Sequence, residues 1–199
     1  MPPGERPLVA YALARIKAPG AAAAVRKLFV DTEPGMLVST MPWLGWAELS
    51  LTSADAEIPS AEALRQMRGT AWKFQLTEDE AGVADADMVG GFVFTKSRNP
   101  LPTWQTLRPL AFLCTMLGDK RLTHDDEVAG ELASTRTSLR FVRQLAVDDA
   151  VMHMFRDAQR AKGGIRLALW DQTLTLDASS MGLLCATEVL RSVAERAGK

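Results

Sequence analysis

The sequence is poor in the residue types that most often carry chemistry. It holds two histidines, two cysteines and one tyrosine among 199 residues. Zinc centres and disulfide frameworks need more of these residues at regular spacings. The chain also lacks a phosphate-binding glycine loop, a dinucleotide fingerprint, a nucleophile elbow, and CxxC and HExxH motifs. We therefore expect no catalytic residue, no metal site and no cofactor, and we favour a binding protein over an enzyme.

Long apolar runs and an excess of charge are missing as well. No run reaches the ~18 residues that a membrane span needs, and the opening "MPPGERP" has no apolar signal-peptide core. Cys114 and Cys185 both lie in apolar segments, which is typical of reduced thiols in a cytoplasmic protein. The net charge of −1 gives no overall attraction to nucleic acid or to an acidic membrane. We expect a cytoplasmic protein without a membrane partner, and the alanine- and arginine-rich composition favours a bacterial source.

The first half of the chain reads as alternating strands and helices. Hydrophobic residues make up 47% of the sequence, enough to form a core. Short apolar or alternating segments bounded by Pro and Gly predict strands over residues 7–16, 36–41, 46–53, 70–77 and 88–97. Alanine-rich and amphipathic segments predict helices over 20–31 and 60–69. The first four strands and the two helices follow the order βαββαβ, which predicts a ferredoxin-like α+β fold over residues 1–98, and the strand over 88–97 would extend its sheet.

The second half reads as a helical region. Helix formers dominate from Asn99 onward, and Pro109 fits the first turn of a helix that ends at Gly118. A hairpin is expected over 165–176, followed by a last helix in which four apolar residues share a face: Leu183, Ala186, Leu190 and Val193. We expect residues 99–199 to form a helical region that packs with residues 1–98 as one compact unit.

The stretch "LTHDDEVAGEL" is the most suggestive candidate site. It places His124 beside Asp125, Asp126 and Glu127, residue types that bind metals or transfer protons. The same residues suit the first turn of a helix, because a hydroxyl at Thr123 can accept a backbone N–H and carboxylates favour the positive end of the helix dipole. We interpret the stretch as a helix start.

A basic helix face is the second candidate. Arg136, Arg140 and Arg143 lie at i, i+4 and i+7, so they share one side of a predicted helix. Arg65, Arg68 and Lys73 surround Trp72 and Phe74 in the sequence. Arginines beside aromatic rings can contact phosphates and stack on bases. The alternative function is therefore a nucleic-acid-binding subunit of a ribonucleoprotein or defence complex.

An aromatic turn is the third candidate. In "MPWLGW", Met41, Trp43 and Trp46 lie at a hairpin-like turn, and exposed tryptophan and methionine are typical of protein interfaces. Nearly every polar cluster has a structural explanation, whereas apolar side chains occur near turns. The favoured function is a non-catalytic protein–protein interaction module, such as an adaptor, a regulatory subunit or an immunity-type binder, whose partner is another protein or a second copy of the chain.

Overall fold

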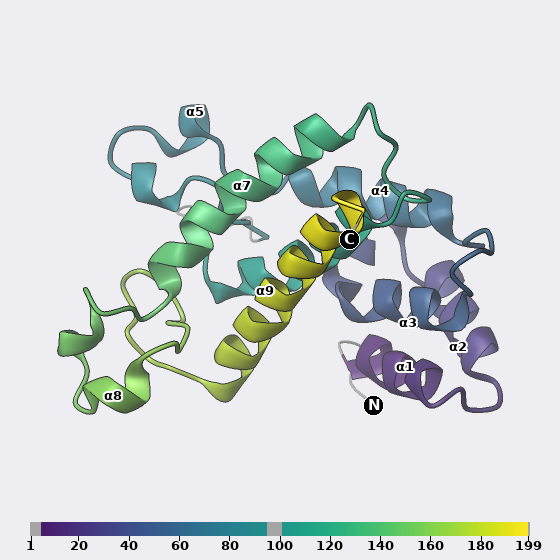
Figure 1. Ribbon diagram of the computed structural model, residues 1–199, viewed down its shortest axis with the longest axis horizontal. Coiled ribbons are helices and arrows are strands. Elements are labelled where there is room, and N and C mark those ends of the chain that lie inside the picture. Colours follow the sequence, from purple (N-terminus) through teal and green to yellow (C-terminus); the bar gives the residue numbers. More distant parts are fainter. Residues whose placement is uncertain (1–4, 95–100, 199) are drawn as a thin grey trace.

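The protein is built from helices. The computed structural model describes residues 5–94 and 101–198. Figure 1 shows helices that cross one another at different angles, and the described residues form no sheet. The longer helices are α1 (Arg6–Arg15), α2 (Ala21–Asp31), α3 (Trp43–Leu51), α4 (Ala61–Trp72), α6 (Leu107–Gly118), α7 (Val128–Leu145) and α9 (Leu176–Arg196). Short elements join them: η2 (Pro34–Thr40), α5 (Glu78–Ala81), η3 (Ala86–Met88), η4 (Trp104–Thr106), η5 (Met152–Met154) and α8 (Ala158–Ala161).

The predicted ferredoxin-like α+β fold is wrong. Residues 7–15 belong to α1 and residues 46–51 belong to α3, where strands were expected. Ala10 and Ala14 are buried four residues apart on α1, the spacing of one helix face. Alanine, leucine and arginine dominate that segment and are the strongest helix formers. α3 is buried on several sides, including Leu44, Trp46 and Ala47, so its sequence carries no clear helical period.

The other predicted strands are also absent from the described residues. Residues 36–40 belong to the 3-10 helix η2, and Thr70 to Trp72 end α4. Backbone pairing in the described ranges is limited to isolated bridges, Gln75 with Phe92, Ala146 with Ile165, and Arg166 with Leu174. The hairpin expected over 165–176 is reduced to this last bridge and a turn, in which the Leu167 N–H donates to the Thr173 carbonyl at 3.0 Å and Asp171 bonds to Ala168. Residues 95–97 of the fifth predicted strand lie outside the described residues.

Helix α6 lies at the centre of the core. The predicted helix ending at Gly118 is confirmed, and every residue of α6 except Arg108 is buried. α9 packs along it more extensively than any other helix, and α7 also contacts it. At Gly45 the backbone of α3 approaches the Phe112 ring so closely that a Cβ would overlap it. One hydrophobic cluster includes buried residues of α1, α3, α4, α6, α7 and α9, so both halves of the chain share a core.

The N-terminal helices attach to this core through aromatic residues. α1 packs against α3, and the Tyr11 ring contacts Trp43 and Trp46 with centroids 5.7 and 5.8 Å apart. Trp46 donates a hydrogen bond from Nε1 to Thr115 Oγ1 of α6 at 2.8 Å. The aromatic side chains therefore join α1, α3 and α6.

Candidate protein-binding site

The "THDDE" stretch precedes a helix but does not cap it as predicted. α7 begins at Val128, after a turn over residues 125–127. Thr123 is fully buried. Its hydroxyl donates to the Met116 carbonyl at 2.8 Å and accepts from Arg68 Nη1 at 2.8 Å. Thr123 therefore links α4 to the end of α6 instead of accepting a backbone N–H of α7.

The carboxylates near this turn are held by arginines. Glu127 accepts the His124 backbone N–H at 2.9 Å and pairs with Arg68 at 2.7 Å. These contacts, the backbone hydrogen bond foremost, lower the pKa of Glu127. Glu131 accepts from Trp72 Nε1 at 2.8 Å, yet burial raises its pKa because desolvation outweighs that bond and the charge of Arg68. The cluster is an interhelical clamp between α4 and α7.

The remaining members of the stretch are exposed. Asp125 pairs with Arg196 of α9 at 3.0 Å, and the side chains of His124 and Asp126 lie in solvent. Within residues 5–94 and 101–198, no group of three or more His, Cys, Asp or Glu side chains is arranged to hold a metal ion.

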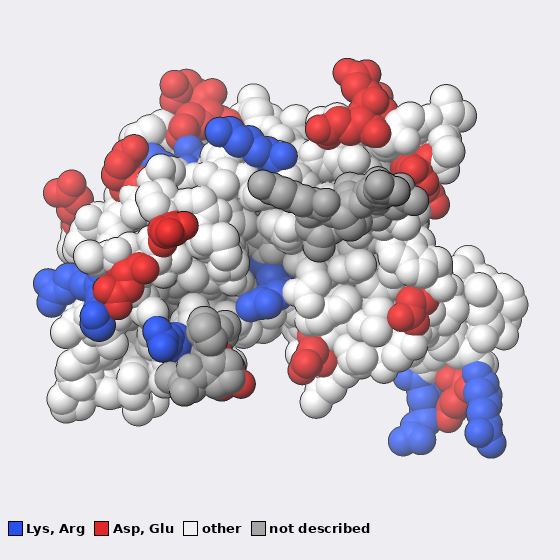
Figure 2. Space-filling model, turned by 180° about the vertical axis from the view of Figure 1, so that it is seen from behind, with Lys and Arg blue, Asp and Glu red and all other residues white. Residues whose placement is uncertain are grey.

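The arginine face predicted on α7 is present at the surface. Arg136, Arg140 and Arg143 are all exposed, and none of them pairs with a carboxylate in the described part of the chain. Glu78 and Arg140 line the same surface pocket, so the acidic segment around α5 lies beside this face. On the face of the molecule that Figure 2 shows, positive and negative side chains are scattered between large uncharged areas.

The arginines expected to flank Trp72 serve the fold instead. Arg68 is buried and bonded to Thr123, Glu127 and the Leu122 carbonyl. Arg65 donates to the Arg121 carbonyl at 2.8 Å. These two guanidinium groups are therefore occupied by contacts within the chain.

The predicted aromatic partner surface lies largely in the interior. Met41 is 1% exposed and Trp46 is 8% exposed. Trp43 is half-buried against Tyr11 and Trp46. The sequence indicates that these aromatic residues lie near one another. However, "MPWLGW" contains the start of the buried helix α3 and does not form an exposed turn.

Several of the most exposed large apolar side chains line one face of α9. Leu176 is 83% exposed, Leu183 and Leu190 are each 71% exposed, and Val193 is 57% exposed. The opposite face, which packs on α6, carries Ala178, Met181, Cys185, Glu188 and Ser192. We call the outward side the α9 face, and it comprises Leu176, Ser180, Leu183, Ala186, Thr187, Leu190, Val193, Ala194 and Ala197. It contains no charged residue.

A groove follows one edge of the α9 face. It lies between α1, α3, the end of α6 and α9, and its volume is about 670 Å³. Its floor includes Trp46 and Thr115, and Leu184 and Arg191 come from α9. In Figure 1, α9 crosses the molecule diagonally, with α1 and α3 on one side and α7 on the other. The groove thus separates the α9 face from the N-terminal helices.

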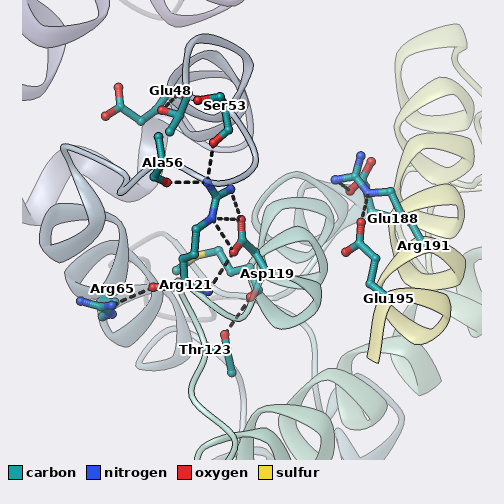
Figure 3. A network of polar contacts seen from close by, with 12 residues as sticks. Glu48, Ser53, Ala56, Arg65, Asp119, Arg121, Thr123, Glu188, Arg191 and Glu195 are labelled. Carbon is teal, nitrogen blue, oxygen red and sulfur yellow. Dashed lines mark hydrogen bonds and ion pairs between the residues drawn. The ribbon is translucent and has the colours of Figure 1, made fainter. Parts of the chain in front are cut away.

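A chain of hydrogen bonds stiffens the α9 wall of this groove. Thr115 Oγ1 bonds to Glu188 Oε2 at 2.7 Å, and Arg191 pairs with the same carboxylate at 2.7 Å. Arg191 also lies 3.6 Å from Glu195, as Figure 3 shows. Because Trp46 donates to Thr115, the network runs from α3 through α6 to α9. α9 is therefore fixed in rotation, with its leucines outward.

A second clamp closes the end of the groove. Asp119 and Arg121 pair at 2.6 Å, and Arg121 donates to the carbonyls of Ser53 and Ala56 (Figure 3). Burial acts to raise the pKa of Asp119, but the hydrogen bonds and charge of Arg121 outweigh it and leave that pKa below its ordinary value. The clamp ties the loop after α6 to the loop after α3.

Comparison with known proteins gives no relative from which to transfer a function. No protein-family model, no curated protein and no solved structure matches this chain. None of the helices within the described residues combines the length and hydrophobicity needed to cross a membrane. The candidate site is therefore argued from its geometry alone.

Proposed function

We propose that this chain is a non-catalytic, cytoplasmic protein–protein interaction module that binds its partner through the α9 face. One observation carries the proposal, the outward row of Leu176, Leu183 and Leu190 with Val193 beside it. Contiguous exposed apolar patches are uncommon on monomeric proteins and mark interaction surfaces. The reduced, buried Cys114 and Cys185 support the cytoplasmic assignment.

The chemistry of the face selects the kind of partner. Its leucines recur at every seventh position, the spacing by which two helices pack side by side. Ala186 lies between Leu183 and Leu190, Ala194 follows Leu190 on the same face, and both small side chains allow close approach. Because the face offers no charge, the partner surface must be apolar and uncharged where it touches α9. An amphipathic helix of another protein, serving the roles of an adaptor, regulatory subunit or immunity-type binder, satisfies these requirements.

Affinity capture with matched variants tests this proposal. The bait is compared with Leu183→Glu/Leu190→Glu and with a control, Val30→Glu/Val83→Glu, whose two positions are also exposed but lie outside α9. We expect the wild-type and control baits to retain a common partner that the α9 double variant loses. The partner is then purified and titrated against all three proteins, with at least a tenfold weaker Kd expected for the α9 variant.

Two results would contradict the proposal. One is an identical set of captured proteins with all three baits. The other is equal affinity of the purified partner for the wild type and for Leu183→Glu/Leu190→Glu. A partner that proves to be a second copy of the chain supports the proposal and assigns the face to self-association.

The exposed arginines of α7 support a second candidate, a nucleic-acid-binding subunit. Arg136, Arg140 and Arg143 are accessible and lack carboxylate partners within the described ranges. Binding to single-stranded RNA should weaken steeply with salt, and replacing all three by alanine should flatten the salt dependence. An unchanged slope, or no binding at low salt, removes this candidate.

A further inference from the structure

A pocket at the N-terminal end of α6 combines apolar walls with one cation. Its volume is about 390 Å³, at the lower end of the roughly 300–1,000 Å³ typical of ligand pockets. η2 supplies Met36 and Val38, and Phe74 and Phe94 come from the segments that flank α5 and η3. Arg108, in the first turn of α6, is the charged residue of its lining.

The aromatic side chains in the wall of this pocket pack against other aromatic rings. The Phe74 and Phe94 rings lie 5.2 Å apart between centroids, and Phe94 stacks on Phe92 at 5.9 Å. Phe92 in turn stacks on Trp72 at 5.6 Å. Met36 and Phe94 remain 57% and 39% exposed, so part of the apolar wall faces solvent.

Arg108 differs from the other arginines that are at least partly buried. Within the described residues, those arginines all bond to carbonyl, amide, hydroxyl or carboxylate oxygens; they are Arg65, Arg68, Arg121, Arg166 and Arg196. The guanidinium of Arg108 makes no hydrogen bond or ion pair in the same part of the chain. Burial lowers the pKa of Arg108, and no charged partner offsets that effect.

The chain has no side-chain carboxylate left with which to pair Arg108. Every aspartate and glutamate lies within residues 5–94 and 101–198, and none forms an ion pair with this residue. The segment 95–100 reads "TKSRNP" and contains no acidic residue. A partly desolvated cation beside an apolar cavity therefore has no side-chain carboxylate as a partner within residues 5–94 and 101–198.

From this pairing of Arg108 with the Met36–Phe74–Phe94 wall, we propose that the pocket binds a small amphiphilic anion. The anionic head, a carboxylate or a phosphate, accepts hydrogen bonds from the Arg108 guanidinium. The aliphatic or aromatic body of the ligand lies against the phenylalanine and methionine side chains. This ligand site is separate from the α9 face and does not depend on the function proposed for that face.

Calorimetric titration with short amphiphiles tests the site. Octanoate and octyl phosphate present the two anionic heads, 1-octanol presents the same body without charge, and acetate presents the head without the body. All are used below the concentration at which they form micelles. We expect saturable binding of one or both octyl anions, at least tenfold weaker binding of octanol, and no measurable binding of acetate.

Variants assign the binding to this pocket. Arg108→Met keeps an unbranched apolar side chain but removes the guanidinium charge, and it should weaken octyl-anion binding at least tenfold. Arg26→Met, at an exposed position of α2, should leave binding unchanged. Leu183→Glu should also leave it unchanged, which separates the pocket from general adsorption to the α9 face. Circular dichroism of each variant confirms that it is folded.

Three outcomes would overturn the proposal. The first is no saturable binding of either octyl anion at millimolar concentration. The second is equal binding of octanoate and octanol, which would make Arg108 irrelevant. The third is unchanged binding by folded Arg108→Met. A preference between octanoate and octyl phosphate identifies the head group and supports the site in either case.

Discussion

At the scale of single residues, buried polar contacts explain the features that look most like chemistry. Thr123 and Glu127 belong to a suggestive sequence stretch, yet both bond to Arg68 inside the protein. A buried arginine is stable only when its hydrogen bonds are made. The contacts of Arg68 therefore account for these residues without a metal or a reaction.

Replacing Thr123 should destabilise the fold, whereas replacing its neighbour should not. Thr123→Val leaves Arg68 without one acceptor, and the variant should lose about 1–3 kcal/mol of unfolding free energy. His124→Ala removes an exposed side chain and should change that energy by less than about 0.5 kcal/mol. Urea unfolding measures both values. The opposite ranking would show that the clamp around Arg68 is misassigned.

The raised pKa of Glu131 has a consequence for the pH dependence of stability. A carboxyl whose folded-state pKa is raised holds its proton more tightly in the folded state than in the unfolded chain. Its contribution to stability is therefore present at low pH and is lost as the pH rises through the folded pKa. Glu127 titrates with the opposite sign because its pKa is lowered, and its contribution is lost as the pH falls.

Glu131→Gln isolates the first of these contributions. The variant keeps an acceptor for Trp72 but no longer titrates, while Glu127 remains in both proteins. The stability of the wild type relative to Glu131→Gln should fall as the pH rises from about 4, near the ordinary glutamate pKa, and then level off. Unfolding free energies between pH 4 and 8 provide the measurement. A relative stability that rises over this range contradicts the assignment.

At the scale of elements, α9 shows where sequence patterns stop being informative. The sequence predicts this helix and places Leu183, Ala186, Leu190 and Val193 on one face, and both statements match the structure. Hydropathy alone selects that leucine face as the buried one. α6 is instead covered by the face with Met181 and Cys185, and the bonds of Glu188 and Arg191 fix this rotation. Bonds between residues far apart in the sequence cannot be predicted from the pattern of residues within α9.

The two faces of α9 should respond differently to truncation. Met181→Ala removes a buried side chain beside α6 and should cost about 2–5 kcal/mol. Leu183→Ala removes a side chain that is mostly in solvent and should cost less than about 0.5 kcal/mol. Thermal and urea unfolding of both variants check the ranking. Equal costs, or a larger cost at Leu183, would mean that the helix is turned the other way.

The strand predictions failed for a related reason. α1 and α3 are short helices, and α3 is also buried on several sides. Neither segment therefore shows the spacing of apolar residues that is typical of an amphipathic helix. The alternation at 46–53 fits a strand equally well. The helix packs Gly45 closely against Phe112 of α6, and the local sequence of α3 gives no indication of this long-range contact.

Two helical glycines offer a matched test of this packing. Gly45→Ala places a Cβ into the Phe112 ring and should destabilise the protein by about 1–3 kcal/mol. Gly69→Ala, in α4, meets no atom within 4 Å and should stabilise it by about 0.5–1 kcal/mol. Melting temperatures of the two variants should move in opposite directions. A neutral Gly45→Ala would contradict the close approach of α3 to α6.

At the scale of the whole molecule, a central helix is enclosed by others, and α9 covers it with its less apolar side. The arrangement leaves a leucine-rich surface in solvent next to a groove of about 670 Å³. Turning the leucines inward would bury more apolar area, but Glu188 would then lose its buried hydrogen bond with Thr115 of α6. The exposed α9 face is the feature of the fold that a binding partner explains best.

Site-specific photo-crosslinking in cells tests this central claim most directly. A photoreactive amino acid replaces Leu183 in one protein and Val83, an exposed residue outside α9, in another. We expect illumination to give a discrete adduct of higher mass from position 183 and none from position 83, with twice the monomer mass if the partner is a second copy. No adduct from position 183, or the same adducts from both positions, would contradict the assignment of α9 as the interaction surface.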